Sequence, residues 1–210
     1  MRDGTVVDLQ VTNVTTYLAF KATQNGLSRK VNGTFGVINL LAPSSSDASF
    51  VQLRYTFLSA ATGQPVTLGR THMSFYDFDS TQYGVRECMQ VQGGVVAETM
   101  SESTELQLME QAATGVSLPA GVEEWSSGVG GASSLFCSTA VGTGKDNPAN
   151  PRELTDLQQS RSVMITFESV STFDVRYTLW GGQGTGRNFL FAGYSNVADP
   201  LCERPPSLLP

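Results

Sequence analysis

Apolar and polar residues alternate with a period of two along much of this chain. In residues 51–57 and again in residues 173–179, every second side chain is a large apolar or aromatic group, and the side chains between them are polar. Side chains of a β-strand point alternately to its two faces, so this pattern predicts strands with one buried and one hydrated face. Similar patterns predict further strands near residues 5–12, 15–22, 34–41, 66–78, 85–92, 94–100, 104–109, 134–141, 161–169 and 188–192.

These strands are short and are separated by turns rich in Gly, Pro, Asn and Ser. Such a pattern predicts an all-β fold, in which two antiparallel sheets pack as a jelly-roll-like β-sandwich. One short helix is expected within residues 147–159. Asn150 can cap it, Pro151 suits its first position and Glu153 completes a box-like cap.

Residues 72–91 place carboxylates where a β-hairpin should bury apolar side chains. Asp77 and Asp79 lie on one face of an expected strand, and Glu87 lies on the corresponding face of the next strand. If residues 80–84 form a hairpin loop, Asp77 stands opposite Glu87, and like charges so placed destabilise a strand pair. A hard cation reverses this effect, and calcium takes carboxylate and carbonyl oxygens as ligands. The sequence therefore predicts a calcium site.

Calcium takes about six to eight oxygen ligands, so a second segment has to contribute some of them. The Gly-rich turn at residues 142–147 is the expected donor, through Asp146, Asn147 and its backbone carbonyls. The spacing of these acids does not match an EF-hand loop. Two alternatives stay open: the carboxylates are hydrated at the rim of the sandwich, or Glu87 pairs with an arginine such as Arg86.

Few residues suggest catalysis. His72 is the only histidine, and the chain has no Gly-x-Ser-x-Gly motif around a nucleophilic serine. The adjacent acids Glu123 and Glu124 suggest a two-carboxylate glycosidase, but neighbouring residues of a strand point in opposite directions. The Gly-rich segments 142–146 and 181–186 lack the residues or the following helix of a phosphate-binding loop. We therefore expect a protein that is not an enzyme.

Aromatic side chains offer a different kind of binding surface. Trp125, Trp180 and Tyr83 are candidates for a carbohydrate- or partner-binding platform, because exposed aromatic rings stack on sugar faces. Trp180 continues the polar face of the strand at residues 173–179, so its parity places it outside the core. Packing in the core or at the rim is the alternative for these rings.

Charged residues make up only 15% of the chain, and the net charge is −6. This balance argues against a nucleic-acid partner, whose phosphates attract Lys and Arg. No apolar run is long enough for a membrane span, so we expect no membrane insertion. Asn13 and Asn32 each begin a glycosylation sequon. Together with the abundance of Gly, Ser and Thr, the sequons favour an extracellular or cell-surface location.

The chain has 210 residues and three cysteines. We expect one domain at residues 1–197, followed by an extended Pro-rich tail at 198–210. Cys88 and Cys137 lie in expected strands and are the expected disulfide pair, which leaves Cys202 in the tail free to pair with another chain. Three buried free thiols in a cytosolic protein are the alternative.

Four segments carry a resemblance to a known group of modules: FYDFD at residues 75–79, ECMQVQG at 87–93, GKDNP at 144–148 and RNFLFAG at 187–193. Together they resemble uncharacterised extracellular β-sandwich modules of microbial and algal surface proteins, over about residues 50–193. The resemblance implies a secreted or surface-displayed module with a structural cation site and no known catalytic residues.

The leading hypothesis is a non-enzymatic, calcium-stabilised extracellular β-sandwich for surface adhesion or for assembly with copies of itself or with surface proteins. One alternative is a carbohydrate-binding, lectin-like module that uses Trp180 or Trp125. Another is a structural subunit of a filament or coat, in which Cys202 and the tail reach a neighbour. A strand exchanged between subunits would support assembly.

Overall fold

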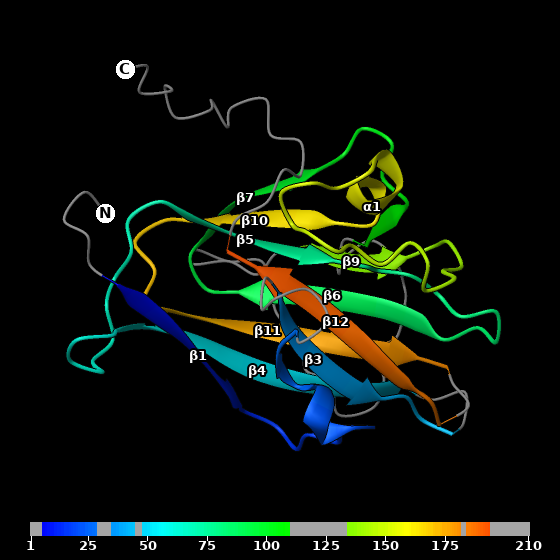
Figure 1. The fold of residues 1–210 in the computed structure, drawn as a ribbon, viewed down its shortest axis with the longest axis horizontal. Coiled ribbons are helices and arrows are strands. Elements are labelled where there is room, and N and C mark those ends of the chain that lie inside the picture. The colour runs from blue at the N-terminus through cyan, green and yellow to red at the C-terminus, as the bar shows by residue number, and fades with distance from the viewer. Residues whose placement is uncertain (1–5, 29–34, 45–47, 110–133, 182–183, 194–210) are drawn as a thin grey trace.

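The structure is a computed structural model that describes residues 6–28, 35–44, 48–109, 134–181 and 184–193 (Figure 1). In this part of the chain, the strands form two antiparallel sheets of six strands each, which pack face to face. The predicted two-sheet β-sandwich is therefore confirmed.

Strands from the whole length of the chain are interleaved in both sheets. The first sheet contains, in spatial order, β1 (Val7–Asn13), β4 (Ala48–Ser59), β11 (Thr172–Trp180), β6 (Arg86–Gln92), β9 (Leu135–Ser138) and β8 (Leu106–Met109). The second sheet contains β2 (Gly26–Leu27), β3 (Gly36–Leu41), β12 (Gly186–Ala192), β5 (Thr71–Tyr76), β10 (Val163–Phe167) and β7 (Val95–Met100).

The core lies between the two sheets and is rich in aromatic rings. Tyr55 on β4 and Tyr177 on β11 are fully buried there, with their hydroxyl oxygens 2.8 Å apart. This mutual hydrogen bond satisfies two polar groups that would otherwise be costly to bury. Phe173 stacks on Tyr55, and Phe189 packs against Tyr177 from the opposite sheet. The alternating pattern of β4 and β11 thus places its apolar side chains in the interior, as predicted.

One expected strand, at residues 15–22, is wrong. This segment crosses from the first sheet to the second and contains only a short 3-10 helix, η1 (Ala22–Gln24). Single hydrogen bonds to β3 take the place of a strand ladder: Lys21 N donates to Asn39 Oδ1 at 2.6 Å, and Leu18 O accepts from Leu41 N at 2.9 Å. Asn39 lies on β3, so the partner that replaces a strand ladder is distant in the sequence.

The expected hairpin at residues 72–91 is also wrong. β5 belongs to the second sheet and β6 to the first, so residues 77–85 cross between the sheets (Figure 1). Asp77 is therefore not the cross-strand partner of Glu87. Within the crossing, Ser80 forms isolated bridges to Arg86 and to Val141, and Ser80 N donates to Ala140 O at 2.8 Å.

The short helix exists, but it begins later than expected. α1 (Asp156–Ser160) starts at Thr155, whose hydroxyl accepts a hydrogen bond from Gln158 N while the Gln158 side chain accepts one from Thr155 N. This capping box is complete, whereas Asn150 heads a turn in which Glu153 N donates to Asn150 O. No helix in the described ranges is long and apolar enough to cross a membrane.

Candidate functional site

The crossing between β5 and β6 brings carboxylates into the interior. Asp77 follows the last residue of β5 and has a φ of 66°, in the left-handed region that Asp tolerates better than most residues. Asp77 is 6% exposed, Asp79 is 3% exposed and Glu87, on β6, is fully buried. The three acids therefore lie close together, as predicted. The segment that crosses between the two sheets, and not a hairpin, brings them together.

Arg187 supplies the positive charge for two of these acids. It lies at the start of β12, where its Nη2 donates to Asp79 Oδ1 and its Nε donates to Glu87 Oε1. Glu87 is held further, because its Oε2 accepts from Asp79 N at 3.3 Å and its own N donates to Ser138 Oγ at 3.1 Å. One guanidinium thus links β12 to both the crossing and β6.

A second arginine forms the other half of the same cluster. Arg161, just before β10, donates through Nη1 to Asp146 Oδ2 and through Nε to Glu105 Oε2 at 2.7 Å. Its carbonyl oxygen accepts from Phe78 N at 3.1 Å, within the crossing. We call Asp77, Asp79, Glu87, Asp146, Arg161 and Arg187 the carboxylate–arginine cluster.

Close backbone approach is part of this arrangement. Gly142 lies against the Asp79 carboxylate, and a Cβ added to Gly142 would stand 1.5 Å from Asp79 Oδ2. Only glycine leaves room for the carboxylate at this distance. Gly142 N also donates to Ser80 O at 3.0 Å, so the turn that carries Asp146 is fastened to the crossing.

The cluster contains four carboxylates and two guanidinium groups, and the surplus of negative charge perturbs its titration. Burial raises the pKa of Asp77 from 3.8 to about 7; Arg187 opposes this rise and Asp146 adds to it. Burial, followed by the charge of Asp77, also raises the pKa of Glu87 well above its ordinary value. Near neutral pH a proton on Asp77 therefore removes part of the surplus charge.

The pKa values of Arg187 and Asp146 are both lowered, which favours the neutral form of the arginine and the ionised form of the aspartate. Burial lowers the pKa of Arg187, and the charge of Asp77 works against this effect. For Asp146, burial favours the neutral form, but hydrogen bonds from backbone N–H groups, including that of Thr143, together with the charge of Arg161 lower its pKa. Asp146 therefore stays ionised beside Arg161, whereas Asp77 is poised to change charge near pH 7.

The structure brings four of the five expected calcium ligands together. Asp77, Asp79, Glu87 and Asp146 belong to the cluster, whereas Asn147 is exposed and its carbonyl oxygen accepts from the Gln158 side chain. Within the described ranges, no group of three or more His, Cys, Asp or Glu side chains is arranged to hold a metal ion. Calcium remains a prediction, and arginines provide the compensating charge in this structure.

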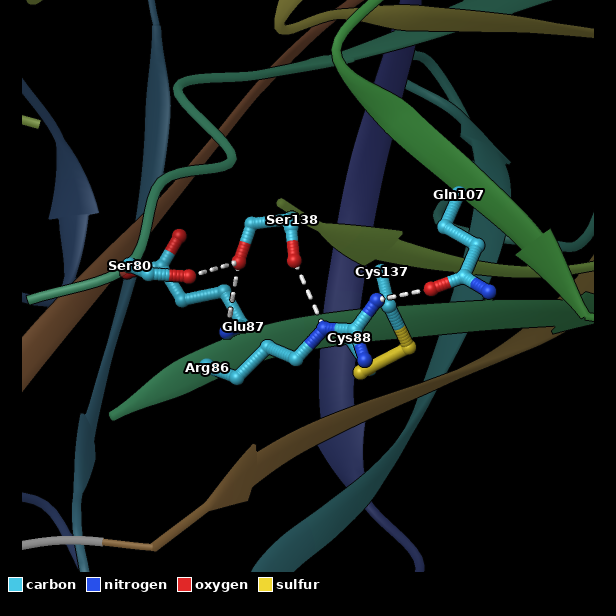
Figure 2. The surroundings of a disulfide bond; sticks show 7 residues. All are labelled: Ser80, Arg86, Glu87, Cys88, Gln107, Cys137 and Ser138. Atoms are coloured by element: carbon cyan, nitrogen blue, oxygen red, sulfur yellow. Dashed lines mark hydrogen bonds between the residues drawn. A yellow bond between two sulfur atoms is a disulfide. The ribbon is translucent and has the colours of Figure 1, made fainter. Parts of the chain in front are cut away.

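The arginine partner of Glu87 is Arg187 and not the neighbouring Arg86. Arg86 turns to β9 and β8, where its Nε donates to Ser138 O at 2.6 Å and its Nη2 to Gln107 Oε1 at 2.7 Å (Figure 2). One sequence signal pointed to Arg187: it has the same parity as Phe189 and Phe191, which face the core. The expected strand at 188–192 began one residue too late to show this parity.

The disulfide between Cys88 and Cys137 is confirmed. The two cysteines are directly opposite each other in the β6–β9 pair and bridge the strands on the outer face of the first sheet (Figure 2). Leu135 packs beside them, and Trp180 lies partly buried against this small cluster. Cys202 lies outside the described residues.

Trp180 lies outside the inter-sheet core, as its parity indicated, but it is not a free platform. Its indole N–H is buried and has no hydrogen-bond partner among the described residues. Tyr83 is 59% exposed in the crossing. Gly84 and Gly181, the next residues along the chain, approach closely, since a Cβ added to Gly181 would lie 3.1 Å from Gly84 O.

Three other predicted surface residues, Asn13, Asn32 and Trp125, have different outcomes. Asn13 is exposed at the end of β1, where its Nδ2 donates to Thr15 O at 3.1 Å. Asn32 and Trp125 lie outside the described residues. Glycosylation of Asn13 therefore meets the requirement of exposure and stays a prediction.

Comparisons with known proteins add no relative. No family model matches the chain, and no curated protein or solved structure matches it either. The arrangement of its own residues is thus what a functional proposal has to rest on.

Proposed function

We propose that this protein is a non-enzymatic structural module of an extracellular surface assembly. One observation carries the proposal: exposed apolar side chains gather at the start of the described chain. Of the ten large apolar side chains exposed in the described ranges, five lie between residues 6 and 27, namely Val6, Val14, Leu18, Phe20 and Leu27. These five residues are close in the sequence, and a partner that covers this part of the surface would account for their exposure.

The disulfide supports an extracellular location. Bonds such as Cys88–Cys137 form and persist in oxidising compartments and are rare in the cytosol.

The carboxylate–arginine cluster supports a structural role more than a chemical one. Its charged groups are buried or half-buried, and Arg187 ties Asp79 in the crossing and Glu87 on β6 to β12, while Arg161 binds Asp146 of the turn and its carbonyl oxygen accepts from Phe78 N in the crossing. A substrate would have to displace these contacts before it reached a carboxylate. Adhesion or assembly of a stiff module requires no such opening.

Location tests the proposal directly. Antibodies raised against the protein should label intact cells that produce it, while a cytosolic marker stays unlabelled until the cells are made permeable. Protein isolated in the presence of a thiol-blocking reagent should carry Cys88 and Cys137 unblocked, because they are joined. Labelling only after permeabilisation, with both thiols blocked, would contradict the proposal.

Carbohydrate binding is a second candidate, favoured by the proximity of two turns. Gly84 and Gly181 come close, so the exposed ring of Tyr83 and the partly buried ring of Trp180 come from adjacent places on the surface. A glycan that binds there should change tryptophan fluorescence, and Tyr83→Ala should abolish the change. Absence of any binding on a broad glycan array would contradict carbohydrate binding and leave only the structural role.

A further inference from the structure

The four edges of the two sheets are not equally protected. At three of them the outermost strand is short or irregular: β8 has four residues, β2 has two, and the pairing of β7 with β10 shifts register between Thr166 and Phe167. β1, the fourth, has seven residues and pairs with β4 without a shift. It contains no Pro, Lys or Arg, which are the residues that commonly protect an edge strand.

The hydrogen-bonding groups on the outer side of β1 can be identified from its register. Ala60 N donates to Val6 O and Val14 N donates to Gln52 O, so the even-numbered residues of β1 bond to β4. Because bonding alternates along an antiparallel pair, Val7, Leu9 and Val11 direct their N–H and C=O groups outward. No strand of the described ranges pairs with that side of β1.

A groove of about 1050 Å³ runs beside this edge and opens into the core. Val7, Leu9 and Val11 form one wall, β2 and β3 form the opposite wall, and core side chains such as Phe57 and Phe191 line its depth. The three β1 side chains are only half-buried. Among the described residues, the same edge therefore has neither a strand partner nor a cover for its apolar side.

We propose that β1 pairs with β1 of a second copy of this chain, antiparallel and centred on Gln10, so that two six-stranded sheets join into one sheet of twelve. In this register Leu9 of each copy lies opposite Val11 of the other, and the outward-facing backbone groups bond to each other. Directly opposite side chains share a face. The Val11 of each copy thus comes to the mouth of the other copy's groove.

The charge pattern of β1 suits pairing with itself. Asp8 is its only charged residue, and in this register Asp8 lies opposite Thr12, so that no like charges meet. The net charge of −6 on each copy opposes association at long range, and salt screens that repulsion. Pairing should therefore strengthen when the salt concentration is raised. This inference rests on the proposed assembly role and names its first partner.

Charge substitutions on the exposed face of β1 test both the surface and the register. The anionic variant, Gln10→Glu with Thr12→Glu, sets like charges opposite each other at three places of the paired strands. The cationic variant, Asp8→Lys with Gln10→Lys, does so at one place. Asp8, Gln10 and Thr12 are exposed in the single copy, so each variant should keep the wild-type unfolding temperature.

Sedimentation velocity from about 1 μM to about 1 mM covers the range in which such a contact is measurable. The wild type should form dimers. The anionic variant should dimerise about three- to a hundredfold more weakly and the cationic variant about two- to fivefold more weakly. An equimolar mixture of the two should associate more tightly than either alone, because opposite charges then face each other.

Three results would overturn the inference. One is a wild type that stays monomeric throughout. Another is a dimer that the substitutions and their mixture leave unchanged, which would place the contact elsewhere. The last is a monomer that dimerises only after residues 194–210 are removed, which would show that the groove takes the chain's own end. None of these results bears on surface labelling of intact cells, so the proposed function can fail or stand separately.

Discussion

Replacing Arg187 with methionine removes the one positive charge that contacts both Asp79 and Glu87. Methionine keeps the length and apolar contact of the side chain, so the charge is the main change. The side chains of Asp79 and Glu87 are 5% and 1% exposed, respectively, and water cannot replace the lost guanidinium without opening the cluster. Breaking one partner out of a buried ion pair costs about 3–5 kcal/mol.

For a chain of this size, that loss should lower the unfolding midpoint by about 6–20 °C. Differential scanning calorimetry and near-ultraviolet circular dichroism at pH 7 measure the shift. Arg54→Met is the matched control, because Arg54 pairs with Asp174 with its side chain 51% exposed, and exposed pairs contribute only about 0–1 kcal/mol. Adding Glu87→Gln to Arg187→Met should recover part of the loss, since it removes a charge left unpaired.

A loss below about 1 kcal/mol, equal to that of the control, would refute this reasoning. It would mean that Arg187 does not hold the buried carboxylates. A loss that calcium reverses, in the variant and not in the wild type, would instead show that a cation can take the place of the arginine.

The remaining predictions concern the same cluster, the disulfide and the cation. Between about pH 4 and pH 7 the folded state binds more protons than the unfolded state at Asp77, whose pKa is raised to about 7, so the free energy of unfolding should fall as pH rises through this window. Asp77→Asn, which also tolerates a positive φ, should flatten this dependence in urea titrations and stabilise the protein at pH 8 by up to about 4 kcal/mol; an unchanged slope would contradict the assignment. Gly142→Ala should cost about 1–3 kcal/mol, while Gly69→Ala, where an added Cβ meets nothing within 4 Å, should cost much less. The double replacement of Cys88 and Cys137 by alanine opens a loop of 49 residues and should lower the free energy of unfolding by about 4 kcal/mol in the same titrations, and a change near zero would argue against the bond. About 1 mM calcium tests the predicted cation site: a site with a dissociation constant near 10 μM would add about 2.7 kcal/mol to the free energy of unfolding, and Asp77→Asn should abolish that gain, whereas a cluster neutralised by its arginines alone would leave the midpoint unchanged.

The sandwich was predictable because a strand that is buried on one face has alternating apolar and polar residues in its sequence. In β4 and β11 every second residue faces the core, and the alternation reads directly as a strand. The crossing after β5 differs, because Tyr76, Asp77, Phe78 and Asp79 are all buried and their burial does not alternate. A buried run of this kind indicates a segment that crosses the interior between the two sheets, and the predicted hairpin did not take this into account.

The acids of the candidate site were predictable for a similar local reason, and their partners were not. Glu87 shares its strand face with the apolar residues Val85, Met89 and Val91, which marks it as unusual within a few residues. Arg187 is 108 residues from Asp79 and 100 from Glu87, and Arg161 is 15 from Asp146. Strand periodicity does not show which segments become neighbours in the fold. The sequence therefore indicated buried negative charge but not the arginines that neutralise it.

β12 connects the carboxylate–arginine cluster with the groove beside β1. Arg187, at its start, is tied into the carboxylate–arginine cluster, and Phe191 and Ala192, at its end, line the groove beside β1. Charged side chains are therefore buried at the start of β12, whereas at its end the apolar core is open to the groove. The fastened end resists opening, because separating its strands would leave buried charges unpaired. The open end has half-buried side chains and an unpaired strand edge, and it is where amide hydrogens should exchange first. If two copies pair through β1, protection in β1 should rise with protein concentration while protection around the cluster stays constant, because only the open end changes its surroundings.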